Sequence, residues 1–216
     1  MIIDVPTSLG SGRLTVSEAA QPRAVVWLGH GAGGGIGALD LTALADHLPE
    51  HGFTVARYEQ PWRVAGKKLA PRPATLDIAW RETANAVAEL ADGLPLVVGG
   101  RSAGARVACR TADDLGAAAV MCLAFPLHPP GKPEKTRLDE LLLPSAPTVV
   151  LQGDRDTFGT ASDVEREIGS RDSIRVVPIP GADHSMKVLA SSPLKAQDVA
   201  ALVTASVADF LEGVLA

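Results

Sequence analysis

The sequence contains few cysteines, few aromatic residues and no long apolar segment. Its two cysteines, Cys109 and Cys122, are too few for a disulfide framework, and their spacing suits no metal site. We therefore expect two buried free thiols in a reducing compartment, and no metal ion. No apolar run reaches the roughly 18 residues of a membrane span, and the first residues lack the basic and apolar regions of a signal peptide. These absences predict a cytoplasmic protein that does not contact a membrane.

Positive charge is also scarce. The chain has 20 lysines and arginines against 25 aspartates and glutamates, which gives a formal net charge of −5. Its basic residues are scattered and do not interleave with the aromatic residues, which make up 4% of the chain. The sequence therefore gives no electrostatic reason to expect nucleic acid or an anionic membrane as a partner, and a small molecule is the expected one. It does not determine the oligomeric state.

Apolar residues make up 46% of the chain and follow strand-like and helix-like patterns in turn. A polar turn rich in glycine and serine joins two short N-terminal strands, which suits an antiparallel hairpin at a sheet edge. Strands and helices then alternate, which implies right-handed crossovers and a mostly parallel sheet covered on both faces. We expect an α/β fold: a single domain, 1–216, built as a three-layer α/β/α sandwich with no large cap domain.

Proline and glycine mark the boundaries of the expected elements. Residues 60–73 contain three prolines and residues 125–133 contain four, so both segments predict irregular loops. Strands are predicted over 2–5, 13–17, 24–28, 53–57, 96–98, 117–124, 148–151 and 173–177, and helices over 40–51, 74–91, 161–168 and 194–215, with a further helix directly after Ser102.

The strongest chemical signal lies around Ser102. An apolar run over 96–98 predicts a buried strand, and the residues after Ser102 predict a helix. Between them, residues 100–104 read Gly-Arg-Ser-Ala-Gly, which matches the G-x-S-x-G of a nucleophile elbow. A serine on so sharp a turn is held clear of the sheet, near the positive N-terminal end of the helix. We therefore predict that Ser102 is a catalytic nucleophile.

A serine nucleophile needs a base, and a third group that orients the base. In chains with this elbow, an acid and then a histidine follow the serine in sequence. Asp154 and Asp156 both follow the predicted strand 148–151, at the sheet edge where catalytic groups gather. Asp154 suits a turn in which it bonds its own backbone, which favours Asp156 as the acid. Of five histidines, only His184 follows in a loop after the last strand, so it is the predicted base.

Two backbone N–H groups near Ser102 are needed to form an oxyanion hole. Ala103, the residue after the nucleophile, is expected to supply one. The second is expected from the His-Gly-Ala-Gly-Gly-Gly segment that begins at His30, where glycines let the backbone approach a substrate. We choose Ala32 as this donor, with Gly33 as the alternative. His30 is expected to hold the loop by hydrogen bonds rather than to react.

The same segment also satisfies the dinucleotide-binding pattern G-x-G-x-x-G, from Gly29 to Gly34. Glu59 lies near the end of the next strand, where a ribose-binding acid could lie. A lone match of this kind is weak, and a dinucleotide site would leave the elbow, Asp156 and His184 without a role. We therefore expect no cofactor.

Five segments, LGHGAGGG, GGRSAGARVA, FPLHPPGKPEKTR, LQGDRDTFG and GADHSM, together resemble the small α/β-hydrolases related to dienelactone hydrolases. The chain is similar to the branch whose eukaryotic members include a testis-expressed hydrolase-like protein and a subunit of a nuclear acetyltransferase complex. The resemblance implies an α/β-hydrolase fold with Ser102, Asp156 and His184 as the triad, because similar enzymes place the acid three residues after the glycine of LQGD. Dienelactone hydrolases proper use a cysteine at the position of Ser102, so we do not expect this chain to act on their substrate.

These residues predict a serine hydrolase of the carboxylesterase or thioesterase class. It would cleave a small carboxylic ester or thioester through an acyl-enzyme intermediate. The alternative is an α/β-hydrolase scaffold used for protein interaction, but a binding module has no need for all three triad groups.

Substrate contacts are expected from both the glycine-rich loop and the basic loops 60–73 and 125–137. The basic side chains of these loops have two interpretations: solvated surface charge, or attraction of an acidic acyl group or a phosphate-bearing leaving group. Arg106, one helical turn past the serine, is expected to brace the elbow through a carboxylate or a carbonyl. The candidate substrate-binding residues are His30, Gly33, Arg101 and His128.

Overall fold

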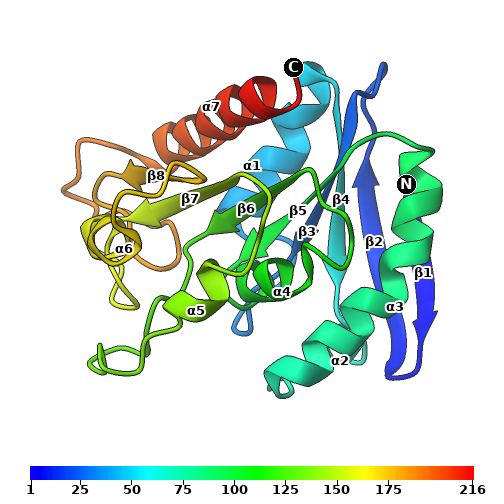
Figure 1. Cartoon of the computed structure of the whole chain (residues 1–216), viewed down its shortest axis with the longest axis horizontal. Helices are drawn as coiled ribbons and strands as arrows, with labels where there is room; N and C mark the ends of the chain where they lie inside the picture. The colour runs from blue at the N-terminus through cyan, green and yellow to red at the C-terminus, as the bar shows by residue number, and fades with distance from the viewer.

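The computed structural model describes all of residues 1–216, as an eight-stranded sheet between two layers of helices (Figure 1). The strand order is β1-β2-β4-β3-β5-β6-β7-β8. β1 and β2 form an antiparallel hairpin at one edge, β2 is antiparallel to β4, and all other neighbouring strands are parallel. The predicted three-layer sandwich is therefore confirmed. The strands are β1 Ile2–Thr7, β2 Gly10–Ser17, β3 Ala24–Gly29, β4 Phe53–Glu59, β5 Leu96–Arg101, β6 Ala119–Leu123, β7 Thr148–Gly153 and β8 Ile174–Ile179.

Helices cover the sheet on both faces, and each face has its own apolar core. Figure 1 shows α1 and α7 on one side of the sheet, with α4 and α5 on the other. In β3, Val26 and Leu28 point into the core beneath α1 and α7, whereas Trp27 points into the opposite core, because successive strand residues face opposite ways. The helices are α1 Leu39–His47, α2 Pro61–Val64, α3 Pro73–Ala91, α4 Ala103–Thr111, α5 Leu138–Leu141, α6 Ala161–Ile168 and α7 Ala196–Val214.

The predicted helix over 40–51 is divided in two. α1 ends at His47, and a 3₁₀ turn, η1, continues over Leu48–His51. Pro49 explains the division, because its ring would clash with a carbonyl of the preceding turn in a continuous α-helix. The prediction of one uninterrupted helix was wrong at this proline.

The segment 60–73 is not wholly irregular, as the sequence had suggested. Pro61 begins the single turn α2, and Pro73 begins α3. Proline fits at the first position of a helix, where its missing N–H would have no partner and its fixed φ is already helical. The prediction of an irregular loop over 60–73 was therefore wrong at Pro61 and Pro73, each of which begins a helix. The short helix α5 was not predicted.

Both cysteines are buried free thiols, as expected, with their Sγ atoms 3.4 Å apart. The contact with Cys109, together with burial, raises the pKa of Cys122 well above its usual value, so this thiol stays protonated. No helix in the structure combines the length and the apolar character that crossing a bilayer requires.

The parallel strands place the predicted functional residues together. The carboxyl ends of β3, β5, β7 and β8 meet at one edge of the sheet. The loops that leave these ends carry the glycine-rich segment, Ser102, Asp156 and His184. Ligand sites of open α/β sheets lie at this edge.

Candidate active site

Ser102 lies on a sharp turn between β5 and α4. Its backbone has φ 52° and ψ −108°, a conformation in the positive-φ region that residues with a side chain rarely adopt. Such strain persists where the surrounding structure holds it, and it is common at functional sites. The Ser102 N–H donates to the carbonyl of Leu123 on the neighbouring strand β6, at 2.9 Å, which ties the turn to the sheet.

Two glycines allow the turn to pack against β3. A Cβ on Gly104 would meet the backbone carbonyl of Gly29, and a Cβ on Gly100 would meet the same carbonyl oxygen. Gly100 also has φ +157°, which L side chains rarely adopt. Glycine is therefore required at the first and last positions of G-x-S-x-G because β3 packs closely there, as well as because of the turn.

The structure brings Ser102, His184 and Asp156 into one hydrogen-bonded chain. The distance from Ser102 Oγ to His184 Nε2 is 2.9 Å, and that from His184 Nδ1 to Asp156 Oδ2 is 2.8 Å. An ionised carboxylate only accepts hydrogen bonds, so Nδ1 carries a proton and Nε2 offers its lone pair to the serine hydroxyl. This is the geometry of a nucleophile, a base and the acid that orients the base.

Asp156 is held by more than the histidine. Its Oδ1 accepts from the N–H of Phe158 at 2.8 Å, and its Oδ2 also accepts from Gln152 Nε2 at 3.0 Å. The Phe158 ring stacks on the His184 imidazole, with 4.1 Å between centroids. These contacts fix the carboxylate and the face of the imidazole before a substrate arrives.

Asp154, the competing candidate, points elsewhere. Its Oδ1 accepts from the N–H of Gly181 at 2.8 Å, and the side chain is exposed. It therefore secures the loop that carries His184 rather than contacting the imidazole. The hydrogen bond is to a distant backbone N–H rather than to its own turn.

Ala32 and Ala103 both line the cleft around Ser102. Ala103 is the first residue of α4, and neither its N–H nor that of Ala32 donates to an acceptor in the protein. Gly33 lines the same cleft. The two candidate oxyanion donors and the alternative therefore lie at one site, with free N–H groups on the first two.

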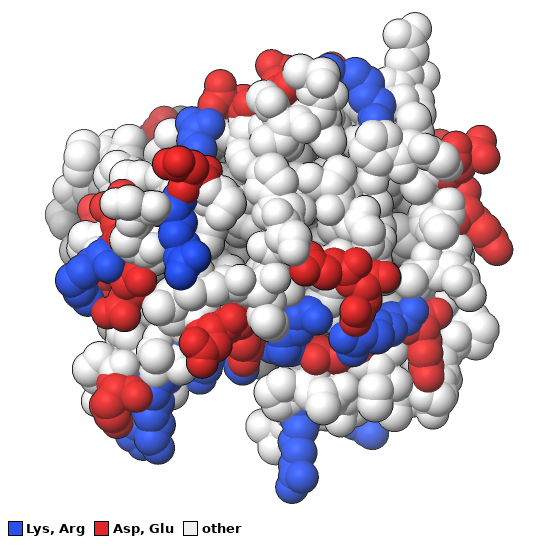
Figure 2. Space-filling model, in the orientation of Figure 1, with Lys and Arg blue, Asp and Glu red and all other residues white.

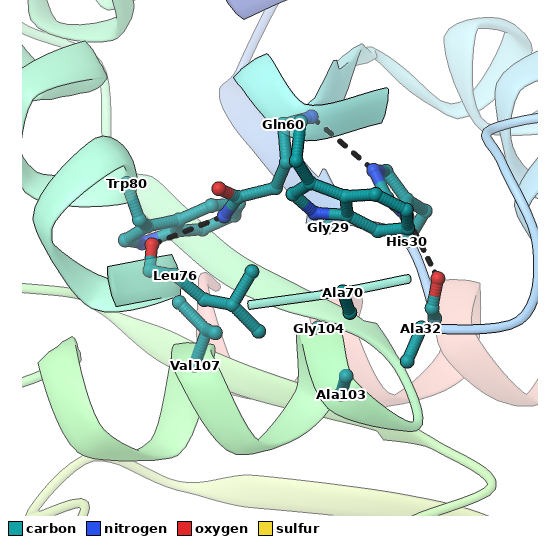
Figure 3. Close-up of a pocket in the computed structure, with 12 residues that line it drawn as sticks. Gly29, His30, Ala32, Gln60, Ala70, Leu76, Trp80, Ala103, Gly104 and Val107 are labelled. Atoms are coloured by element: carbon teal, nitrogen blue, oxygen red, sulfur yellow. Dashed lines mark hydrogen bonds between the residues drawn. The ribbon is translucent and has the colours of Figure 1, made fainter. Parts of the chain in front are cut away.

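His30 joins the glycine-rich loop, residues 31–35, to the residue that follows β4, Gln60 (Figure 3). Its Nδ1 lies 2.8 Å from the carbonyl of Gly31, and its Nε2 accepts from the N–H of Gln60 at 3.2 Å. Burial lowers the pKa of His30, which favours the neutral imidazole that both contacts need. The arrangement matches a histidine that positions the loop.

A small pocket lies behind the same loop, between His30 and the start of α4 (Figure 3). Apolar side chains, including Trp62, Leu76 and Val107, line it. Its volume is about 10 Å³, which holds about one water molecule and no acyl chain. Any substrate of useful size must therefore occupy the larger cleft in front of Ser102.

That cleft has a volume of about 600 Å³. It reaches from the glycine-rich loop past Ser102 to the loops that carry Arg137 and Lys187. The predicted residue His128 is not part of its lining; its Nδ1 lies 3.0 Å from the carbonyl of Pro129. The segment 60–73 lines the small pocket and not this cleft.

Arg101 lines the cleft but is already paired. Its Nη1 donates to Asp40 Oδ2 at 2.8 Å, and its Nη2 donates to the backbone carbonyl of His184. Asp40, in the first turn of α1, is fully buried. The ion pair thus ties Arg101, the residue before the nucleophile, to α1, and the hydrogen bond from Nη2 ties it to the loop that carries His184.

Removing the Arg101 side chain should strongly destabilise the fold. In Arg101→Ala the buried carboxylate of Asp40 loses its counter-ion, a change that costs about 3–5 kcal/mol in the free energy of unfolding. Urea denaturation followed by circular dichroism measures the change. The double variant Asp40→Asn/Arg101→Ala should recover part of the loss, because no unpaired charge remains. An Arg101→Ala variant as stable as wild type would contradict this account.

Arg106 braces α4 as expected, through a carboxylate. Its Nε and Nη2 donate to Glu140 of α5 at 2.8 and 2.6 Å. Sequence reasoning missed Asp40, Gln152, Phe158 and Lys187. Gln152 and Phe158 lie within four residues of Asp156, so proximity to the acid could have found them; nothing in the sequence marked Asp40.

The G-x-G-x-x-G match is part of this same site. Gly31, Ala32 and Gly33 line the cleft beside Ser102. The dinucleotide pattern requires its glycine-rich loop to open directly into a helix. Here further loop residues separate Gly34 from α1, which begins at Leu39.

A parallel α/β sheet with a serine elbow, and with a histidine and an aspartate at the ends of later strands, defines the α/β-hydrolase class of proteins. The chain belongs to this family: the family model described as "Alpha/beta hydrolase domain" matches residues 22–212. The expected fold family is therefore confirmed.

Solved structures with the same fold include several hydrolases. XC6422 from Xanthomonas campestris, described as a serine hydrolase without a lid, has 20% identity and a TM-score of 0.76, over 97% of this chain and 94% of that one. Est1E from Butyrivibrio proteoclasticus, solved with ferulic acid, has 15% identity and a TM-score of 0.74, over 99% of both chains. Dienelactone hydrolase from Anabaena variabilis has 16% identity and a TM-score of 0.73, over 100% of this chain and 98% of that one. These likenesses show a shared fold.

Proposed function

We propose that the protein is a serine hydrolase that cleaves a small carboxylic ester or thioester through an acyl-enzyme intermediate. The observation that carries this proposal is the chain of hydrogen bonds from Ser102 through His184 to Asp156, at the edge of an open cleft. Family membership supports it, as does a fold shared with proteins described as a serine hydrolase, a serine hydrolase homologue and an esterase domain.

In the proposed first half-reaction, the Ser102 hydroxyl gives its proton to His184 Nε2 as its oxygen attacks the substrate carbonyl. The negative charge on the carbonyl oxygen is stabilised by the N–H groups of Ala32 and Ala103, and by the N-terminal end of α4. His184 then gives the proton to the departing alcohol or thiol, which leaves an acyl group on Ser102. Asp156 holds the imidazole and stabilises its positive charge.

In the second half-reaction, water takes the place of the serine hydroxyl. His184 removes a proton from the water as it attacks the acyl carbonyl, and the same two N–H groups stabilise the new oxyanion. His184 returns the proton to Ser102 as the acid departs. No other group is required for the cycle.

Labelling with a fluorophosphonate probe tests this proposal. An activated serine reacts with the probe, so the wild-type protein should gain the mass of one phosphonyl group, on the peptide that contains Ser102. A panel of para-nitrophenyl esters and acyl thioesters should then show turnover. A correctly folded protein that resists the probe and all these substrates would overturn the proposal, and an interaction-scaffold role would be tested next by affinity capture.

A further inference from the structure

The charge of the cleft differs from that of the rest of the molecule. The chain has a net charge of −5, and on the face shown in Figure 2 acidic and basic side chains alternate without segregating. The lining of the cleft contains no aspartate or glutamate, but four basic residues: Arg101, Arg106, Arg137 and Lys187.

Two of these positive charges are already neutralised within the protein. Arg101 pairs with Asp40, and Arg106 pairs with Glu140. Glu140 also accepts from Arg110 at 2.5 Å, and Arg110 has Asp77 as a second carboxylate partner, so two carboxylates balance these two arginines. Neither Arg101 nor Arg106 is therefore free to supply a whole charge to a ligand.

Arg137 has no carboxylate partner. Its Nη1 donates to the carbonyl of Pro126 at 2.8 Å, and its backbone N–H donates to the carbonyl of Leu127 at 2.7 Å. Two uncharged acceptors thus hold Arg137 beside the cleft, while its other guanidinium N–H groups have no protein partner. Burial and the nearby charge of Arg106 lower the pKa of Arg137, and the carboxylate of Glu140 opposes them only in part. No carboxylate lies close enough to form an ion pair with Arg137.

Lys187 contributes the second unpaired charge. It is exposed, lines the same cleft, and follows His184 in the loop that carries the base. No acidic side chain forms an ion pair with it. Of the seven basic residues in the loops 60–73 and 125–137, only Arg137 lines this cleft.

We propose that the substrate carries a carboxylate or phosphate group, which Arg137 binds with support from Lys187 in the cleft beside Ser102. This inference rests on the proposed hydrolase function and specifies its substrate class. Planar guanidinium groups pair well with carboxylate and phosphate oxygens, and the acid-free lining adds no repulsion. The anionic group belongs either to the acyl portion or to the leaving group.

Matched pairs of esters test the proposal and separate these two sources. The acyl arm compares the para-nitrophenyl monoester of adipic acid with its methyl ester, which lacks the free carboxylate. The leaving-group arm compares para-(carboxymethyl)phenyl butyrate with its methyl ester. We expect kcat/KM to be about tenfold higher for the anionic member of one pair, the size of a single charge-assisted hydrogen bond. Added salt should reduce that advantage.

Two variants in the same loop identify the residue responsible. Arg137→Gln should bring the ratio of anionic to neutral kcat/KM close to one, whereas Lys135→Gln, an exposed lysine outside the cleft, should leave the ratio at its wild-type value. Lys187→Gln should lower the ratio by a smaller factor. Thermal melting checks that each variant is folded.

The outcomes separate this inference from the function on which it rests. If neutral esters are turned over and neither anionic ester is preferred, the proposed anionic substrate class is wrong, whereas the proposed hydrolase function is supported. A preference that survives Arg137→Gln would overturn the assigned residue. Absence of both probe labelling and ester turnover would overturn the hydrolase function, and the substrate class with it.

Discussion

Replacing Ser102 with alanine should lower kcat for ester hydrolysis by about 10⁶-fold and abolish labelling by the fluorophosphonate probe. The reason is that, in the proposed mechanism, Ser102 Oγ forms the covalent bond to the substrate, and the structure places no other hydroxyl at 2.9 Å from His184 Nε2. The residual rate should come from the oxyanion donors and from substrate binding alone. Initial rates with a para-nitrophenyl ester measure the loss.

The triad should also behave as a unit. Because the base acts only through the nucleophile, His184→Ala should lose about as much activity as Ser102→Ala, and the double variant should lose little more. Ser191→Ala, an exposed serine without a side-chain hydrogen bond, is the matched control and should retain wild-type kinetics. Probe labelling that persists in Ser102→Ala would place the nucleophile elsewhere.

Replacing Asp156 with asparagine should lower kcat by about 10⁴-fold while leaving the fold intact. Oδ1 and Oδ2 of Asp156 both accept hydrogen bonds, from Phe158, Gln152 and His184. An asparagine amide must turn its NH₂ group toward at least one of these donors. It also removes the negative charge that stabilises the imidazolium formed during the reaction.

Asp154→Asn provides the matched control two residues away. Its amide oxygen can still accept from the N–H of Gly181, and the side chain is exposed, so kcat should change by no more than about twofold. The comparison needs only kcat for four proteins: wild type, the two single variants and the double variant. Equal losses in both single variants would show that the acid was assigned wrongly.

Much of the fold could be predicted because it depends on local patterns. Alternating apolar strands and helices are sufficient to predict a parallel sheet, since connections between parallel strands need crossovers. Boundaries were less certain at prolines. Pro49 interrupts a helix, whereas Pro61 and Pro73 each begin one. The residues around each proline do not show whether it ends a helix or starts one.

The candidate substrate-binding residues show a similar limit. Arg101 and His128 are both polar residues near catalytic motifs, yet Arg101 pairs with Asp40 and His128 lies outside the cleft. Whether a basic side chain is free for a ligand depends on its neighbours in space. Arg137 and Arg106 illustrate this, because both line the cleft but only Arg106 has a carboxylate partner.

The sequence by itself determined the class of fold, the elbow around Ser102, and the order in which an acid and His184 follow it. These features lie in short contiguous segments whose backbone requirements restrict the residues that fit. Only the tertiary structure decided that Asp156 and not Asp154 lies against His184, and that Asp40 neutralises Arg101. Such contacts join segments far apart in the chain, so their distances depend on how the whole sheet and its helices pack, and no local pattern encodes them.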